Sequence, residues 1–122
     1  MESTFRRMTK SAERRDAYLR AEVVTALAHQ IRSIRGQRGW TQAELAERMS
    51  TSQAVISRLE DPSYGRYSLV TLFDLARAFD VGLEVRFESF VGMLQKTWRP
   101  NAEARNVPSF EEEASTVDFH SA

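Results

Sequence analysis

The chain has 122 residues, of which 42% are hydrophobic, and its 17 basic and 17 acidic side chains cancel. This length suits one domain, which buries roughly two-thirds of the surface that the unfolded chain exposes. The absence of cysteine excludes a disulfide framework and a thiolate metal site, and no apolar run approaches the ~18 residues that span a bilayer. The first residues also lack the apolar core of a signal peptide, so we expect a cytoplasmic protein with no membrane partner.

The charges are distributed unevenly along the chain. Residues 1–38 hold nine cations against four anions, whereas residues 99–122 hold five anions against two cations. A basic head can approach phosphate even though the net charge is zero. The alternative is that both runs are solvated surface, and composition does not separate the two interpretations.

The first predicted element is a helix from about Ser11 to Arg38, because apolar residues recur three or four positions apart at Leu19, Val23, Leu27, Ile31 and Ile34. Its first part, about residues 11–20, is either a separate arm or a continuous extension. We expect Gly36 and Gly39 to end the helix. This gives a basic helical extension over residues 1–21, followed by a domain over residues 22–81.

Two short helices joined by a tight polar turn are predicted between Gln42 and Glu60. Thr41 and Glu44 have the spacing of a capping box, which fixes where the first helix begins. One face of each helix is apolar, and the small Ala46 allows close crossing; the other apolar residues are Leu45, Met49, Ile56 and Leu59. This is the pattern of a DNA-reading helix-turn-helix.

The remaining positions of the second helix are short, polar or basic, and such side chains can reach base edges. We expect bases to be read by Ser52, Gln53, Ala54, Ser57 and Arg58. Free backbone N–H groups and a positive dipole end meet at the first turn of the preceding helix. We expect phosphates to be held by the basic N-terminal region and by Gln42, Thr51, Tyr64 and Arg66.

A loop, a helix and a strand are predicted after Glu60. Pro62 cannot continue the helix, and Ser68 can cap the next one. The apolar stripe of that helix indicates core: Leu72, Leu75, Ala76 and Phe79. Residues 80–82 end it, and residues 83–88 then alternate apolar and charged, which is typical of a strand with one buried face.

This strand has no second strand of comparable quality after it, and an unpaired strand edge is rarely tolerated. The simplest partner is a second copy, paired antiparallel about a two-fold axis through Val85, so that opposite charges and apolar residues face each other. The alternative is a strand against the chain's own tail. We expect residues 82–98 to carry the dimer interface, formed by Leu83, Glu84, Val85, Arg86 and Phe87.

The rest of the chain is less informative. Residues 90–98 are predicted to form a short amphipathic turn or helix, and residues 99–122 an irregular acidic tail. Trp98 and Phe110 are expected to pin this tail onto the body.

Residues 22–81 resemble the phage-repressor and Cro-like (Xre) helix-turn-helix family, and the following strand resembles that of antitoxin-type members. The resemblance implies a mainly α fold, with a four- to five-helix domain followed by one β-strand in an intersubunit antiparallel sheet. It also implies that Gln42 contacts a phosphate, that the polar positions of residues 52–58 line the recognition helix, and that Arg35 pairs with Glu60.

Two positions depart from the family pattern. Ser50 stands where a turn glycine is common, and positive φ at this position would cost about 1 kcal/mol. Asp61 and Pro62 replace the usual Asn-Gly, so the course of residues 61–67 is not given by the resemblance.

The chain offers little for catalysis, because His29 and His120 are not at metal-ligand spacing and no glycine-rich phosphate loop accompanies them. We expect no enzyme activity, cofactor or metal. The expected function is a sequence-specific transcriptional regulator, a repressor that binds double-stranded DNA as a homodimer on a palindromic operator. The alternative is an antitoxin that neutralises a toxin protein and autoregulates its operon.

Overall fold

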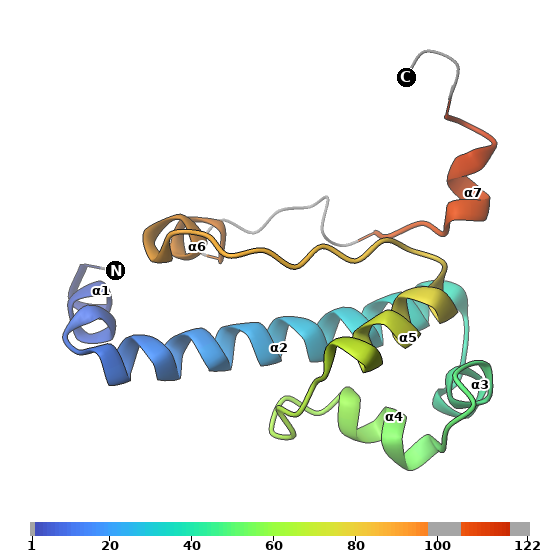
Figure 1. The fold of residues 1–122 in the computed structure, drawn as a ribbon, viewed down its shortest axis with the longest axis horizontal. Coiled ribbons are helices and arrows are strands. Elements are labelled where there is room, and N and C mark those ends of the chain that lie inside the picture. The colour runs from blue at the N-terminus through green and yellow to red at the C-terminus, as the bar shows by residue number, and fades with distance from the viewer. Residues whose placement is uncertain (1, 98–105, 118–122) are drawn as a thin grey trace.

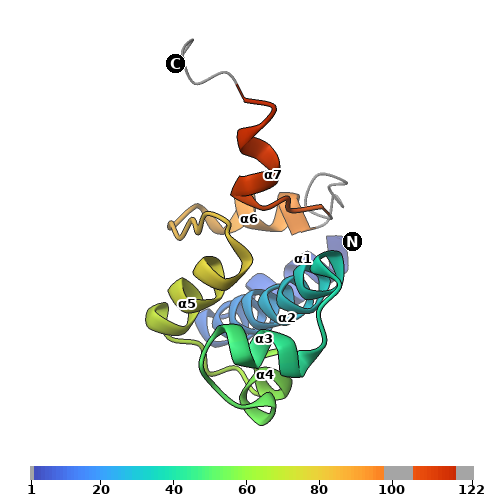
Figure 2. The ribbon, with the colours of Figure 1, turned by 90° about the vertical axis from the view of Figure 1, so that its right-hand side faces the viewer.

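The computed structural model describes residues 2–97 and 106–117, and these residues form helices joined by turns and extended segments (Figure 1). The helices are α1 (Glu2–Thr9), α2 (Ala12–Arg38), α3 (Gln42–Arg48), α4 (Gln53–Leu59), α5 (Leu69–Phe79), α6 (Phe90–Thr97) and α7 (Phe110–Ala114). The long α2 is the axis of the molecule. The C-terminal half of α2 packs against α5. Helices α3 and α4 lie below α2, and α6 lies above its N-terminal half (Figures 1 and 2).

Helix α2 is continuous over 27 residues, so the predicted helix is confirmed, and the interpretation of about residues 11–20 as a separate arm is wrong. Its N-cap is Ser11, whose hydroxyl accepts a hydrogen bond from the Arg14 backbone N–H. The helix passes through Gly36 and ends at Gly39, which has φ 73° and donates to the Arg35 and Gly36 carbonyls. Positive φ is available to glycine without a steric penalty, so Gly39 is a suitable terminator.

One core joins the C-terminal half of α2 to the three following helices. It contains two buried residues from each helix: Ile31 and Ile34, Leu45 and Ala46, Ile56 and Leu59, Leu75 and Phe79. The predicted apolar faces of these helices are therefore confirmed. By contrast, Leu19 and Val23 continue the apolar stripe of α2 beyond the core and stay exposed.

Helix α5 begins and ends as its sequence predicts. The Ser68 hydroxyl accepts from the Thr71 backbone N–H, and Asp80 ends the helix with φ 58°. None of the helices in the described part of the chain is long and apolar enough to cross a membrane.

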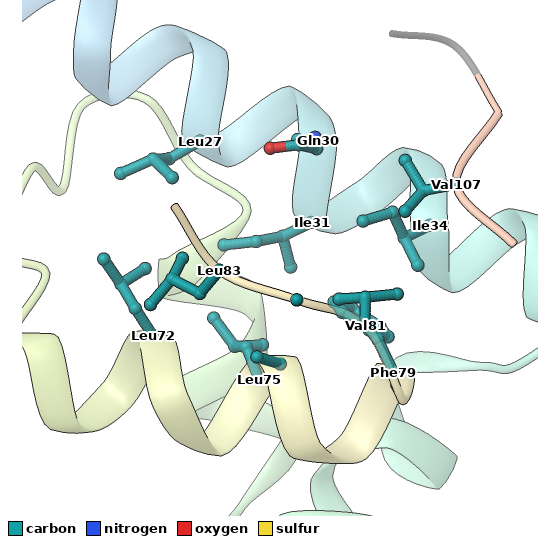
Figure 3. Close-up of a pocket in the computed structure, with 12 residues that line it drawn as sticks. Leu27, Gln30, Ile31, Ile34, Leu72, Leu75, Phe79, Val81, Leu83 and Val107 are labelled. Carbon is teal, nitrogen blue, oxygen red and sulfur yellow. The ribbon is translucent and has the colours of Figure 1, made fainter. Parts of the chain in front are cut away.

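The fold class expected from the sequence is wrong, because residues 2–97 and 106–117 hold seven helices and no β-strand. Residues 81–89 follow an extended path along α2 instead (Figure 1), and they form no strand with the described part of the tail. Glu84 and Arg86 pair with each other, at 2.8 Å. Alternation shows only that two sides of a segment differ. Here Leu83 lines an apolar cavity together with residues of α2 and α5 (Figure 3), whereas Val85 and Phe87 stay exposed.

Hydrogen bonds to backbone groups of the tail hold its described part to the rest of the molecule. Arg38 donates to the Val107 carbonyl (2.9 Å) and to the Phe79 carbonyl (2.8 Å), while the Gln37 amide oxygen accepts from the Val107 N–H (2.8 Å). Asp80 accepts from the Phe110 N–H through its carbonyl at 2.7 Å. Tail residues therefore return to the junction of α2 and α5 and include the short helix α7, which the prediction of an irregular tail did not contain. Trp98 lies outside the described residues.

Candidate nucleic-acid interface

Helix α3 begins at the predicted capping box. The Thr41 hydroxyl accepts from the Glu44 N–H at 3.1 Å, and the Glu44 carboxylate accepts from the Thr41 N–H at 3.3 Å. Two backbone donors that the helix itself cannot use are satisfied in this way. The first turn of α3, which includes Gln42, therefore begins at a defined residue.

The turn between α3 and α4 is tight and contains the predicted strained position. Ser50 has φ 55°, and the Thr51 N–H donates to the Ala46 carbonyl at 2.9 Å. Leu45 and Ile56 on the two sides of the turn are fully buried. Helices α3 and α4 therefore pack closely against each other, and this packing fixes the orientation of the outer face of α4.

The predicted base-reading residues lie on the outer side of α4, at the lower edge of the molecule in Figure 1. Gln53, Ala54, Ser57 and Arg58 are all exposed. Ser52 is exposed too, but its hydroxyl accepts from the Val55 N–H at 3.3 Å and caps the helix. Ser52 thus has a structural role that the sequence interpretation did not assign to it.

Arg35 and Glu60 form a bidentate ion pair. The distances are 2.6 Å from Arg35 Nε to Glu60 Oε2 and 2.9 Å from Nη2 to Oε1, and the side chains are 17% and 5% exposed. Nη1 also donates to the Trp40 carbonyl at 2.9 Å, so all three nitrogens of the Arg35 guanidinium donate hydrogen bonds. Hydrogen bonding to Glu60 raises the pKa of Arg35. The pair connects α2 to the C-terminal end of α4.

The predicted phosphate contacts lie at the first turn of α3, in the turn before α4 and in the loop after it. Gln42 is half-buried and donates to Glu60 Oε1 at 3.2 Å, which leaves one of its two amide hydrogens for another acceptor. Thr51 and Tyr64 are half-buried and Arg66 is exposed. The basic residues of α1 and of the start of α2 are not brought to this face; they lie at the opposite end of α2 from α3 (Figure 1).

Two residues in the loop after α4 were missed by sequence reasoning. The Tyr67 hydroxyl donates to the Leu59 carbonyl at 2.6 Å, and burial, followed by the nearby charge of Asp61, raises the Tyr67 pKa. Asp61 accepts from the Ser63 N–H at 2.9 Å and the Ser63 hydroxyl at 2.8 Å, and these bonds lower the Asp61 pKa. The Asp-x-Ser spacing is a signal for such a turn.

No group of three or more histidine, cysteine, aspartate or glutamate side chains that could hold a metal ion occurs in the described part of the chain. The arrangement around α4 offers short hydroxyls, one amide and one guanidinium on a rigid helix. These groups can donate and accept hydrogen bonds at base edges.

Comparison with known proteins agrees with this geometry. A family model described as a helix-turn-helix domain matches residues 26–87. The protein named Antitoxin HipB from Escherichia coli O6:H1 (strain CFT073) is 36% identical over 59 residues, which are 48% of this chain and 62% of the relative. Antitoxin HipB from Escherichia coli strain K12 is 34% identical over 59 residues, which are 48% of this chain and 66% of that relative. The match thus spans just under two thirds of each relative. No solved structure matches the chain significantly.

Proposed function

This chain belongs to the helix-turn-helix domain family, and we propose that it is a sequence-specific DNA-binding regulator that represses transcription as a homodimer on a palindromic operator. The family expected from residues 22–81 is confirmed by the match over residues 26–87. The observation that carries the proposal is the outer face of α4, whose exposed polar residues stand on a helix that is buried and capped on its other side.

The mechanism is placement of α4 in the major groove. The Gln53 amide can bind adenine through two hydrogen bonds, and the Arg58 guanidinium can bind guanine in the same bidentate way. Gln42, Thr51, Tyr64 and Arg66 hold the phosphates that flank the groove, and they fix the register of the helix without reading sequence. Bound over a promoter, such a protein blocks transcription by occupying the site.

The homodimer follows from the size of the site. One helix of seven residues reads few base pairs, whereas two helices related by a two-fold axis can read half-sites about 34 Å apart, one turn of duplex. The operator then has the same two-fold symmetry as the protein.

Selection from random duplex DNA tests this proposal directly. Purified chain is incubated with the pool at fixed salt, and bound sequences are amplified and read over several rounds. We expect an enriched inverted repeat whose affinity exceeds that of scrambled duplex by roughly 10³-fold or more. Equal affinity for all sequences would contradict the proposal.

A second candidate function is that of an antitoxin that binds and neutralises a toxin protein and represses its own operon. It is favoured by the two relatives named Antitoxin HipB. Coexpression with the product of an adjacent gene tests it, because an antitoxin should restore growth that the product alone arrests and should copurify with it. Growth arrest that coexpression leaves unchanged would argue against this function.

A further inference from the structure

We infer that a groove between the N-terminal half of α2 and the loop after α4 binds an uncharged, apolar small molecule, which lowers operator affinity when bound. The effect on DNA rests on the proposed function, whereas binding in the groove does not. The groove has a volume of about 630 Å³. Its apolar lining comes mainly from six residues: Leu19, Val23, Val24 and Leu27 of α2, Tyr67 of the loop and Leu72 of α5.

The volume of the groove is suitable for a small organic molecule. Pockets that take cofactors and drug-sized ligands usually have volumes of ~300–1,000 Å³ and are lined mostly by apolar and aromatic side chains. The groove meets both conditions. The neighbouring cavity between α2 and α5, which Figure 3 shows, has a volume of only about 80 Å³ and is too small for such a ligand.

The apolar side chains of the groove line a hollow instead of projecting from the surface. Four of the six apolar lining residues are half-buried, and the other two, Leu19 and Val23, are 39% and 46% exposed. Val70 of α5, which does not line the groove, is 68% exposed. A small molecule that enters the hollow can bury most of its own surface there. A flat protein surface would leave the hollow partly unfilled, so the small molecule is the better occupant.

The two charged residues among the described residues that line the groove neutralise each other. Arg20 Nε lies 2.8 Å from Asp16 Oδ2, and the two side chains are 77% and 55% exposed. The Tyr67 hydroxyl already donates its hydrogen to the Leu59 carbonyl, at 2.6 Å. A charged ligand would therefore lose hydration without gaining a free counterion. An uncharged molecule with an apolar body is complementary to this lining.

Tyr67 connects the groove to the predicted recognition helix. It lines the groove, and its hydroxyl binds the carbonyl of Leu59, the last residue of α4. Carbonyls in the last turn of a helix have no partner within the helix, so this bond stabilises the end of α4. The loop also rests on α2, because a Cβ atom at Gly65 would lie 3.7 Å from Val24 Cγ2. A ligand that enters between the loop and α2 therefore displaces the loop that supports α4.

This connection determines the direction of the effect on DNA binding. The bond from Tyr67 to Leu59 is already formed in the structure, so movement of the loop can only weaken it and loosen the end of α4. The ligand and the operator then favour different arrangements of the same loop. By thermodynamic linkage, each should weaken the binding of the other by the same factor.

Fluorescence titration with the uncharged dye Nile red tests the site, because this dye becomes bright in apolar surroundings. The full chain should bind it saturably, with one molecule per chain. Val23→Glu should raise the dissociation constant roughly tenfold or more, since it places a carboxylate against the bound apolar body. Val91→Glu is the matched control, because Val91 is 50% exposed on α6 and does not line the groove. It should bind the dye like wild type.

Ala21→Trp obstructs the groove by volume instead of charge. Ala21 is exposed and lines the groove, so the larger side chain occupies part of the ligand site without altering the core. This variant should also bind Nile red several-fold more weakly than wild type. Urea melts of the three variants should be as cooperative as that of wild type, because all three altered residues are exposed.

Operator titrations with and without saturating Nile red measure the connection to α4. The affinity of wild type for its selected operator should fall roughly fivefold or more, and the operator should weaken Nile red binding by the same factor. Tyr67→Phe removes the hydroxyl that reaches Leu59, so its operator affinity should respond less to the saturating dye. A merely structural role of Tyr67 would lower stability but leave this response unchanged.

The outcomes separate this inference from the proposed function. Nile red binding that does not saturate, or that is as strong in Val23→Glu and Ala21→Trp as in wild type, overturns the site. Saturable binding that leaves operator affinity unchanged overturns its regulatory role. A Val23→Glu protein that sediments as a monomer where wild type is a dimer assigns the groove to a second copy, which also overturns the inference. Saturable binding in the groove by a chain that selects no DNA sequence upholds the site and contradicts the DNA-binding proposal.

Discussion

Arg35 of α2 holds Glu60 at the end of α4 through two hydrogen bonds, of 2.6 and 2.9 Å, in a site where the carboxylate is 5% exposed. Gln42 at the start of α3 binds the same carboxylate at 3.2 Å. One buried acid therefore connects the three helices that present the DNA-binding face. Removal of its partner would leave a buried charge without compensation.

Arg35→Met should lower the free energy of unfolding by about 3–5 kcal/mol, because Glu60 loses its counterion. Denaturant melts of the single variants and of Arg35→Met with Glu60→Gln measure the coupling between the two residues. The matched control is Arg20→Met, since the Arg20–Asp16 pair has a similar 2.8 Å distance but exposed side chains. That variant should melt like wild type, and a coupling of zero for Arg35 and Glu60 would contradict the structural role of the pair.

The turn at Ser50 should be improved by glycine. Ser50 has φ 55°, which costs a residue with a side chain about 1 kcal/mol and costs glycine little. Ser50→Gly should therefore raise the free energy of unfolding by up to about 1 kcal/mol in a urea melt. Ala26→Gly, at an exposed position inside α2, should lower it by a similar amount. A destabilised Ser50→Gly protein would show that the Ser50 side chain makes a compensating contact.

Local signals of the sequence were sufficient for much of the domain. The capping box at Thr41, the cap at Ser68 and the strained Ser50 each depend on residues within a few positions of one another, and all three are present. The same local signal failed for residues 83–88. Alternation there records one apolar and one charged side, but it does not say what the apolar side meets: Leu83 lines a cavity between α2 and α5, while Val85 and Phe87 face solvent.

The contacts that hold the tail could not be predicted from the sequence. Arg38 appears in the sequence as one more cation of the basic head, yet its partners are carbonyls 41 and 69 residues away. A backbone carbonyl has no sequence signature, so the tail was assigned to side-chain anchors instead. Serine suits both a helix cap and a base edge, so the residue type alone does not reveal that Ser52 caps α4.

The dual role of Ser52 can be separated by substitution. Ser52→Ala removes the cap and should cost about 1 kcal/mol of stability, while Ser52→Asn restores an acceptor for the Val55 N–H and should recover most of it. If Ser52 also reads a base, operator affinity should stay low in Ser52→Asn although its melting is normal. Recovery of both stability and affinity would limit Ser52 to the cap.

The Tyr67 hydroxyl should stabilise the loop after α4 in a pH-dependent way. Its bond to the Leu59 carbonyl makes Tyr67→Phe less stable by about 1 kcal/mol near neutral pH. The pKa of Tyr67 is higher in the folded protein than the ordinary value of 10.0 in the unfolded chain. The stabilisation is therefore complete below pH 10.0 and is lost as the pH rises through the pKa of the folded protein. Melts from about pH 9 to about pH 11 should show a steeper fall for wild type than for Tyr67→Phe. Parallel curves would exclude this contribution.

The two predicted classes of DNA contact should respond differently to alanine. Arg58 and Gln53 are exposed on the outer face of α4, so Arg58→Ala or Gln53→Ala should cost ~1–3 kcal/mol at one base pair and flatten the preference there. Gln42→Ala should instead weaken all sequences by a similar factor, because a phosphate contact carries no base information. Titrations of the selected operator and its point variants at fixed salt measure both effects, with Arg32→Ala, an exposed cation of α2, as the control for lost charge. Gln42 also donates a hydrogen bond to Glu60, so the melting curve of the Gln42→Ala protein must be compared with that of wild type before its affinity is interpreted. An Arg58→Ala protein with unchanged affinity and unchanged base preference would show that α4 is not the helix that reads DNA.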